Sequence, residues 1–136
     1  MPNGFTHLTI NSISLIPIYN FFIEDKTGSN EHNKNIELLT AGAAVIGTAK
    51  FPDKLEPALN PNHRDFYHSI LFGIMVGSLG YLALQDLRET RNVRIVAGIK
   101  KITLREVIDI FLVGASASYL IHLIADGFTP KGLPLT

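Results

Sequence analysis

FYHSILFGIMVGSLGYLALQ, residues 66–85, sets the architecture of this chain, because its 20 positions include no Asp, Glu, Lys or Arg. An α-helix of about 20 apolar residues crosses the hydrocarbon core of a bilayer. Residues 4–23 form another uncharged run of 20, whereas residues 38–49 give 12 and residues 110–125 give 16. The two shorter runs can cross the bilayer only if polar residues such as Asp109 lie at the interface between membrane and water. Since all four runs exceed the usual length of a β-strand, we predict an all-α fold, a four-helix up-down bundle.

The composition favours a membrane location for this bundle. Only 18% of the 136 residues are charged, against about 25% in a typical soluble domain. The length fits one helical domain over residues 1–136. The 12 basic and 12 acidic residues cancel, which removes the phosphate-neutralising attraction that drives nucleic-acid binding. No Cys is present, so any metal site must use His and carboxylates. A soluble four-helix bundle is the alternative.

Local signals predict where several helices begin and end. The motif TLRE at 103–106 is a capping box, so the last helix should begin near Leu104. Gly127 follows its apolar run and suits a helix end. Asn35 is the predicted N-cap of the second helix, and Pro17 is expected to kink the first. The intervening segments 24–35 and 86–105 are therefore predicted to be polar connections.

Small residues recur on the third and fourth predicted helices. Gly73, Gly77 and Gly80 follow one another at helical spacing, and GASAS occupies 114–118. Small side chains allow two helix backbones to approach closely in a membrane. In a soluble bundle the same residues would be ordinary packing notches.

Histidines and acids are the reactive side chains of this chain, and their positions predict one site. In an up-down bundle, the starts of the odd helices and the ends of the even helices share one end. Seven residues then converge there: His7, Asp53, Glu56, His63, His68, His122 and Asp126. Imidazoles and carboxylates bind zinc or a similar ion and leave a position for an activated water. The alternative is a purely structural role, in which each His caps a helix and His122 forms a hydrogen bond with Asp126 along one helix face.

Three motifs carry a family resemblance: PDKLEP at 52–57, HRDFYHS at 63–69 and YLIHLIADGFTPKGLP at 119–134. With the early His7, they resemble the motifs of the LexA-binding, inner-membrane-associated metal-dependent hydrolases, a family of small helical membrane proteins from bacteria and their phages. The resemblance runs from His7 to Pro134. That family is itself similar to zinc-dependent phospholipase C enzymes.

The resemblance implies phosphoester hydrolysis at a centre of more than one metal ion. Carried over by position, the implied ligands are His7, Asp53, His63, His68, His122 and Asp126. Longer members have a second acid and a His where this chain has Leu55 and Glu56. A complete two-metal site therefore requires Glu56 to act as a ligand.

The expected function is a membrane-bound metal-dependent hydrolase that uses metal-activated water on a phosphoester or another ester. The ion is expected to be Zn, with Mn or Fe as alternatives, in one or two copies. Asp53 or Glu56 is the expected proton acceptor, and Arg64 is expected to bind an anionic small-molecule or lipid ester. The alternative is a non-catalytic membrane protein whose structural metal site supports binding of a protein partner.

The distribution of basic residues predicts an orientation. The connections 24–36 and 87–105 carry eight Lys or Arg, namely Lys26, Lys34, Arg88, Arg91, Arg94, Lys100, Lys101 and Arg105. The end with the histidines carries four, namely Lys50, Lys54, Arg64 and Lys131. Basic loops face the cytoplasm. In a bacterial inner membrane, whether the protein is of bacterial or phage origin, the site end should then face the periplasm.

Overall fold

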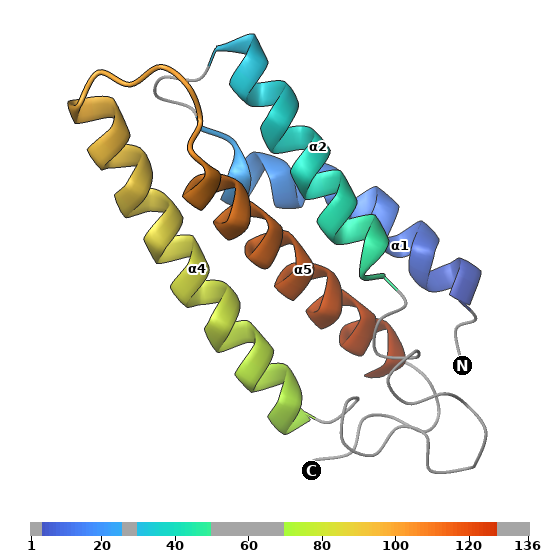
Figure 1. Ribbon diagram of the computed structural model, residues 1–136. Helices are drawn as coiled ribbons and strands as arrows, with labels where there is room; N and C mark the ends of the chain where they lie inside the picture. Colours follow the sequence, from blue (N-terminus) through green and yellow to red (C-terminus); the bar gives the residue numbers. More distant parts are fainter. Residues whose placement is uncertain (1–3, 26–29, 50–69, 128–136) are drawn as a thin grey trace.

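The computed structural model describes residues 4–25, 30–49 and 70–127, and these ranges contain four α-helices and no strand (Figure 1). The prediction of an all-α protein is confirmed. In chain order the elements are α1 (Gly4–Ile18), the π-helical turn η1 (Tyr19–Ile23), α2 (Glu31–Gly47), α4 (Ile70–Val96) and α5 (Leu104–Gly127). α5 lies between α4 and α2 in Figure 1, and it contacts α1, α2 and α4. The core is therefore built around α5.

The first helix changes type after its proline. Pro17 lies inside α1, where it cannot donate a backbone hydrogen bond. Two residues later the chain passes into η1, which closes with a bond of 2.8 Å from the amide of Glu24 to the carbonyl of Tyr19. Wider helical turns of this kind accommodate a break in the α-helical ladder. The local disturbance expected at Pro17 is thus a change to π-helix.

The predicted start of the second helix was wrong. Asn30, in an extended conformation, is the N-cap of α2, and its side chain accepts a hydrogen bond of 2.9 Å from the amide of Asn33. Asn35 instead lies exposed within the helix. Asn30 and Asn35 both have side chains that can cap a helix. A helix that begins at Glu31 includes Asn33, whose buried side chain forms hydrogen bonds with the turn before α5. The Asn33 side chain donates to the carbonyl of Lys100 at 2.7 Å and accepts from the amide of Ile102 at 3.1 Å.

The predicted polar connection before the last helix is much shorter than expected. α4 continues to Val96, well past the uncharged run. The remaining turn contains Gly98, whose φ of 73° suits glycine. α5 then begins at Leu104, as predicted, because the amide of Thr103 donates to Glu106 at 2.8 Å and the amide of Glu106 donates to the Thr103 hydroxyl at 3.3 Å. It ends at Gly127, also as predicted.

A buried ion network explains why α4 extends so far. Arg91 and Arg94 are buried on its last turns. Arg94 contacts Asp25 at 2.8 Å and Glu106 at 3.0 Å. Arg91 contacts Glu37 at 3.1 Å and donates to the carbonyl of Ile23. The network joins η1, α2, α4, α5 and Asp25, the second residue after η1, so these two arginines are not surface charges of a loop.

Burial raises the pKa of the Glu37 carboxyl above its ordinary value, while the nearby Arg91 guanidinium opposes that shift. The network holds two guanidinium groups and three carboxyl groups, those of Asp25, Glu37 and Glu106. Each is buried. Removing a single partner would leave a buried charge without compensation.

Glycines bring α5 close to both neighbours, as their spacing predicted. A Cβ atom built on Gly80 would lie 2.6 Å from the Cβ of Ser116, and one on Gly73 would lie 2.8 Å from Leu123. On the other side, a Cβ on Gly114 would lie 2.9 Å from Ala44. These distances are below ordinary van der Waals contact. Alanine at Gly80 or Gly114 would meet a Cβ atom and so require the helices to shift, whereas alanine at Gly73 would require the Leu123 side chain to move.

We expect Gly80→Ala and Gly77→Ala to change stability in opposite directions. At Gly80 the added methyl group meets Ser116, and overpacking of this kind costs about 1–3 kcal/mol. At Gly77 the nearest atom is 3.5 Å away, so alanine should gain about 1 kcal/mol of helix propensity. Thermal unfolding in detergent measures both variants. A Gly80→Ala variant as stable as Gly77→Ala would contradict the close packing of α4 and α5.

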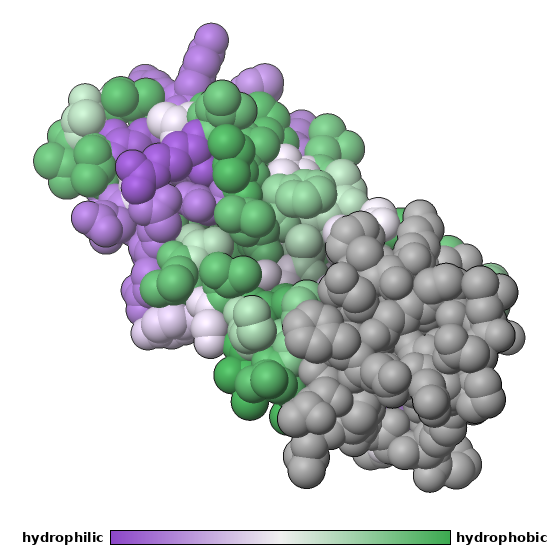
Figure 2. Space-filling view, turned by 60° about the horizontal axis from the view of Figure 1, so that its bottom comes forward, coloured by the Kyte–Doolittle hydropathy of each residue, from purple (hydrophilic) through white to green (hydrophobic). Residues whose placement is uncertain are grey.

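Within the described part of the chain, two helices are long and apolar enough to cross a membrane, α4 with 27 residues and α5 with 24. Large apolar side chains are exposed on all four described helices, among them Ile13, Ile16, Leu39, Leu71, Ile74, Leu79, Leu82, Ile108 and Leu112. On the face seen in Figure 2, hydrophobic residues extend along the helices, while hydrophilic residues gather towards the end that carries the ion network. Exposed apolar surface of this extent is unusual for a soluble monomer.

Candidate metal centre

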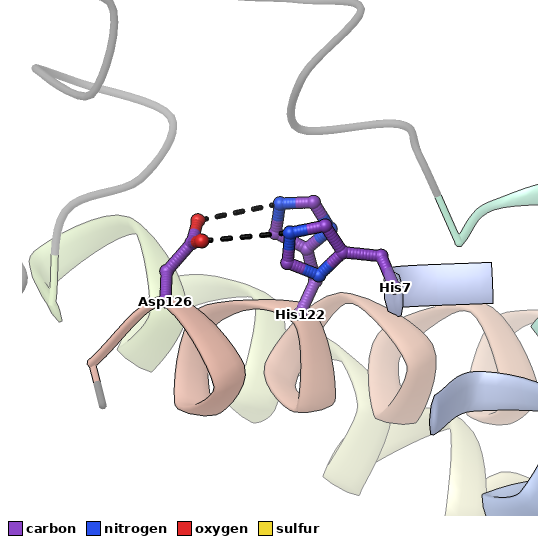
Figure 3. A group of neighbouring side chains, drawn as sticks. All are labelled: His7, His122 and Asp126. Atoms are coloured by element: carbon purple, nitrogen blue, oxygen red, sulfur yellow. Dashed lines mark ion pairs between the residues drawn. The ribbon is translucent and has the colours of Figure 1, made fainter. Parts of the chain in front are cut away.

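Three side chains meet at the end of the molecule opposite the ion network. His7 projects from the first turns of α1, and His122 and Asp126 project from the last turns of α5 (Figure 3). All three are fully buried. The latter two share a face because they are four residues apart on one helix. His7 reaches them because the start of α1 packs against the end of α5.

The two imidazoles face the same carboxyl group. His7 Nε2 lies 3.5 Å from Oδ1 of Asp126, and His122 Nε2 lies 3.4 Å from Oδ2. The rings are stacked, with centroids 3.7 Å apart and planes inclined by 12°. One ligand atom of each residue lies within 4.8 Å of the other two. Atoms at this spacing can surround a single metal ion.

The tautomer of His122 follows from its second ring nitrogen. Nδ1 lies 2.9 Å from the carbonyl oxygen of Ala49, just after α2. A carbonyl oxygen only accepts hydrogen bonds, so Nδ1 carries the proton. Nε2 then presents its lone pair towards Asp126. A carbonyl that holds the outer nitrogen of a histidine is a common second shell of metal sites.

The contacts of Asp126 with the two imidazoles are long for charge-assisted hydrogen bonds. Charge-assisted N–H···O bonds are about 2.7–2.9 Å long, whereas both nitrogen–oxygen separations here are longer. His7, His122 and Asp126 could together hold a metal ion.

A family model described as YdjM inner membrane protein matches residues 1–136. The chain belongs to the YdjM inner membrane protein family. No curated protein and no solved structure matches the chain at a significant level. The inner-membrane location predicted from the sequence is confirmed by this membership, and α4 and α5 of this YdjM-family protein fit membrane spans. Hydrolase activity and LexA binding remain predictions.

Of the seven predicted ligands in the YdjM-family protein, the structure brings together His7, His122 and Asp126. The others, and the predicted anion-binding Arg64, lie outside the described residues: Asp53, Glu56, His63 and His68. His32, expected to be solvated, is exposed, although it lies on α2 rather than in a loop.

Sequence reasoning missed a second polar layer one helical turn below the three residues. Asn11 Nδ2 donates to the hydroxyl of Ser118 at 2.6 Å, and this hydroxyl donates to the carbonyl of Val45 at 2.9 Å. Both side chains are fully buried. The signal was their spacing, since Asn11 follows His7 by four residues and Ser118 precedes His122 by four.

Proposed function

We propose that this protein is a membrane-embedded metal-dependent hydrolase of phosphoesters or other esters, built as an up-down bundle of four helices. The observation that carries the proposal is the buried group of His7, His122 and Asp126. A divalent ion in such a group lowers the pKa of a bound water to about 7 and so supplies a nucleophile at neutral pH.

The donor set fits a catalytic ion. Two His nitrogens and one carboxylate oxygen are a ligand set of catalytic zinc sites, which keep a further position open. Structural zinc sites are closed by four protein ligands and are commonly rich in Cys, which this chain lacks. Zinc is the ion we propose, with Mn or Fe as alternatives.

The proposed roles of Asp53, Glu56 and Arg64 rest on the sequence. Asp53 or Glu56 would accept the proton of the attacking water, and Arg64 would pair with the anionic group of the substrate. Their position in the chain supports these roles, because residues 50–69 begin directly after Ala49, whose carbonyl is 2.9 Å from His122. A second ion would require ligands from the same segment.

An apolar groove favours a lipid ester as substrate. A cavity of about 690 Å³ runs between α4 and α5, and its lining includes Phe72, Val76 and Leu112. Thr48 and Tyr119 also line it. Thr48 is next to Ala49 in the sequence, and Tyr119 is one helical turn before His122. An alkyl chain in the groove would therefore end near the proposed centre.

The test is metal analysis of protein purified in detergent, together with a screen of phosphodiester and lipid-ester substrates. We expect about one equivalent of zinc per chain or more, and turnover that a chelator abolishes. Less than half an equivalent of every divalent metal would exclude the proposed site. Full metal loading without turnover of any ester would exclude the hydrolase.

The second candidate is a non-catalytic membrane protein whose metal site is structural and which binds a protein partner. The complete burial of His7, His122 and Asp126 favours it, because structural sites are shielded from solvent. The two candidates differ in one measurement. In the structural case, His122→Ala lowers the unfolding temperature of the metal-loaded protein while the wild type shows no turnover.

We also propose that the ion-network end faces the cytoplasm and the metal end faces the periplasm. Arg88, Lys100 and Lys101 are exposed near the network end, and basic residues are retained on the cytoplasmic side. A cysteine in place of the exposed Asn92 should be protected from an impermeant thiol reagent in intact cells. Labelling from outside would reverse the orientation.

A further inference from the structure

The polar layer formed by Asn11 and Ser118 repeats the arrangement of the metal group one turn lower on the same three segments. In the upper layer, His122 on α5 contacts the carbonyl of Ala49 at 2.9 Å. In the lower layer, Ser118 on α5 donates to the carbonyl of Val45 at 2.9 Å. His7 and Asn11 occupy the corresponding positions on α1.

The orientation of the Asn11 amide follows from this chain of bonds. The single proton of the Ser118 hydroxyl goes to Val45, so the hydroxyl oxygen must accept from Asn11, and the NH₂ group of Asn11 faces Ser118 at 2.6 Å. Oδ1 of Asn11 is thereby turned away from Ser118. It is buried and has no hydrogen-bond partner within residues 4–25, 30–49 and 70–127.

The His7 ring also has a buried nitrogen that lacks a hydrogen-bond partner among the described residues. Its Nε2 faces Asp126 at 3.5 Å, whereas its Nδ1 is buried and has no hydrogen-bond partner in the described part of the chain. A histidine that binds an ion through Nε2 carries its proton on Nδ1 and usually donates that proton to an oxygen. For His122 this oxygen belongs to Ala49.

We propose that Asn11 is the positioning residue for His7, with Oδ1 accepting the Nδ1 proton across one water. Residues four apart on a helix have Cβ atoms about 5–6 Å apart on the same face, so the buried donor and the buried acceptor are neighbours. Asn11 would fix the tautomer and the ring plane of His7 as Ala49 fixes those of His122. This inference rests on the proposed metal site.

The test compares zinc affinity of detergent-purified wild type, Asn11→Leu and Ser118→Ala by competition with a chelator. Both variants remove the hydrogen bond between α1 and α5, but only Asn11→Leu removes Oδ1. Loss of such an outer partner weakens metal binding about 10–100-fold. We expect that loss for Asn11→Leu and less than threefold for Ser118→Ala. An equal loss in both variants, or none in Asn11→Leu, would show that Asn11 only packs the helices and overturn the inference.

A measurement on the wild type keeps the inference testable if Asn11→Leu does not fold. The imidazole ¹⁵N spectrum of the zinc-loaded protein should show His7 protonated at Nδ1, and protonation at Nε2 would overturn the inference. Failure of the proposed function has a different signature, since wild type that binds no zinc excludes the metal site whatever the variants do.

Discussion

Asp126→Asn should abolish metal binding while leaving the metal-free protein at least as stable as the wild type. Asp126 is fully buried and lies within 3.5 Å of both imidazoles. Losing an outer partner alone weakens a metal site about 10–100-fold, so losing the carboxylate ligand should weaken zinc binding more than about 100-fold. The neutral amide removes a buried charge whose desolvation opposes folding. A substitution that lowers metal affinity and raises the stability of the metal-free protein is expected at a functional site.

Zinc titration followed by thermal unfolding measures both effects. Free zinc at about 100 times the dissociation constant of the wild type should stabilise the wild type by about 2.7 kcal/mol, and it should stabilise Asp126→Asn by less than about 0.4 kcal/mol. Asp86→Asn is the matched control, because Asp86 pairs with the exposed Arg105 on the outer surface. If zinc stabilised Asp126→Asn as much as the control, the proposed centre would be wrong.

Arg94→Met should be the most destabilising single substitution at the other end of the molecule. It removes the contacts to Asp25 at 2.8 Å and Glu106 at 3.0 Å and leaves both carboxylates buried. Breaking a buried pair on one side costs about 3–5 kcal/mol. Arg88→Met, on the same helix but exposed, should cost less than about 1 kcal/mol.

Denaturation in detergent compares the two arginine variants, and a triple variant separates charge from shape. Adding Asp25→Asn and Glu106→Gln to Arg94→Met removes the two carboxyl charges that Arg94 had paired with, so part of the lost stability should return. A loss below about 1 kcal/mol for Arg94→Met alone would mean that water already reaches the network.

Local signals predicted local structure well. The start of α5 was correct because the capping box at Thr103 and Glu106 satisfies its own backbone donors. The end of α4 was missed because Arg91 and Arg94 interrupt the apolar pattern that was used to find helices. Their burial depends on Glu106, beyond the end of the helix, and on Asp25 and Glu37, which lie more than 50 positions away in the sequence. No local pattern reveals that pairing.

The candidate site was predicted from the expected order of the helices, whereas its second polar layer was missed because of the side chains that were considered. His7 and His122 lie more than 100 positions apart, yet the structure brings them together with Asp126. Asn11 and Ser118 were overlooked because only ionisable groups were counted as reactive. A neutral amide binds no proton near pH 7, but an amide beside a metal-binding imidazole can determine which ring nitrogen keeps one.

The ion network also bears on how the chain is made. Of the three carboxyl groups that face Arg91 and Arg94, two belong to Asp25 and Glu37 in the first third of the sequence. Proteins are synthesised from the N-terminus, so these acids leave the ribosome well before the arginines. The carboxyl groups that pair with Arg91 and Arg94 are therefore already synthesised when these arginines leave the ribosome, so each guanidinium group can be buried against an existing partner.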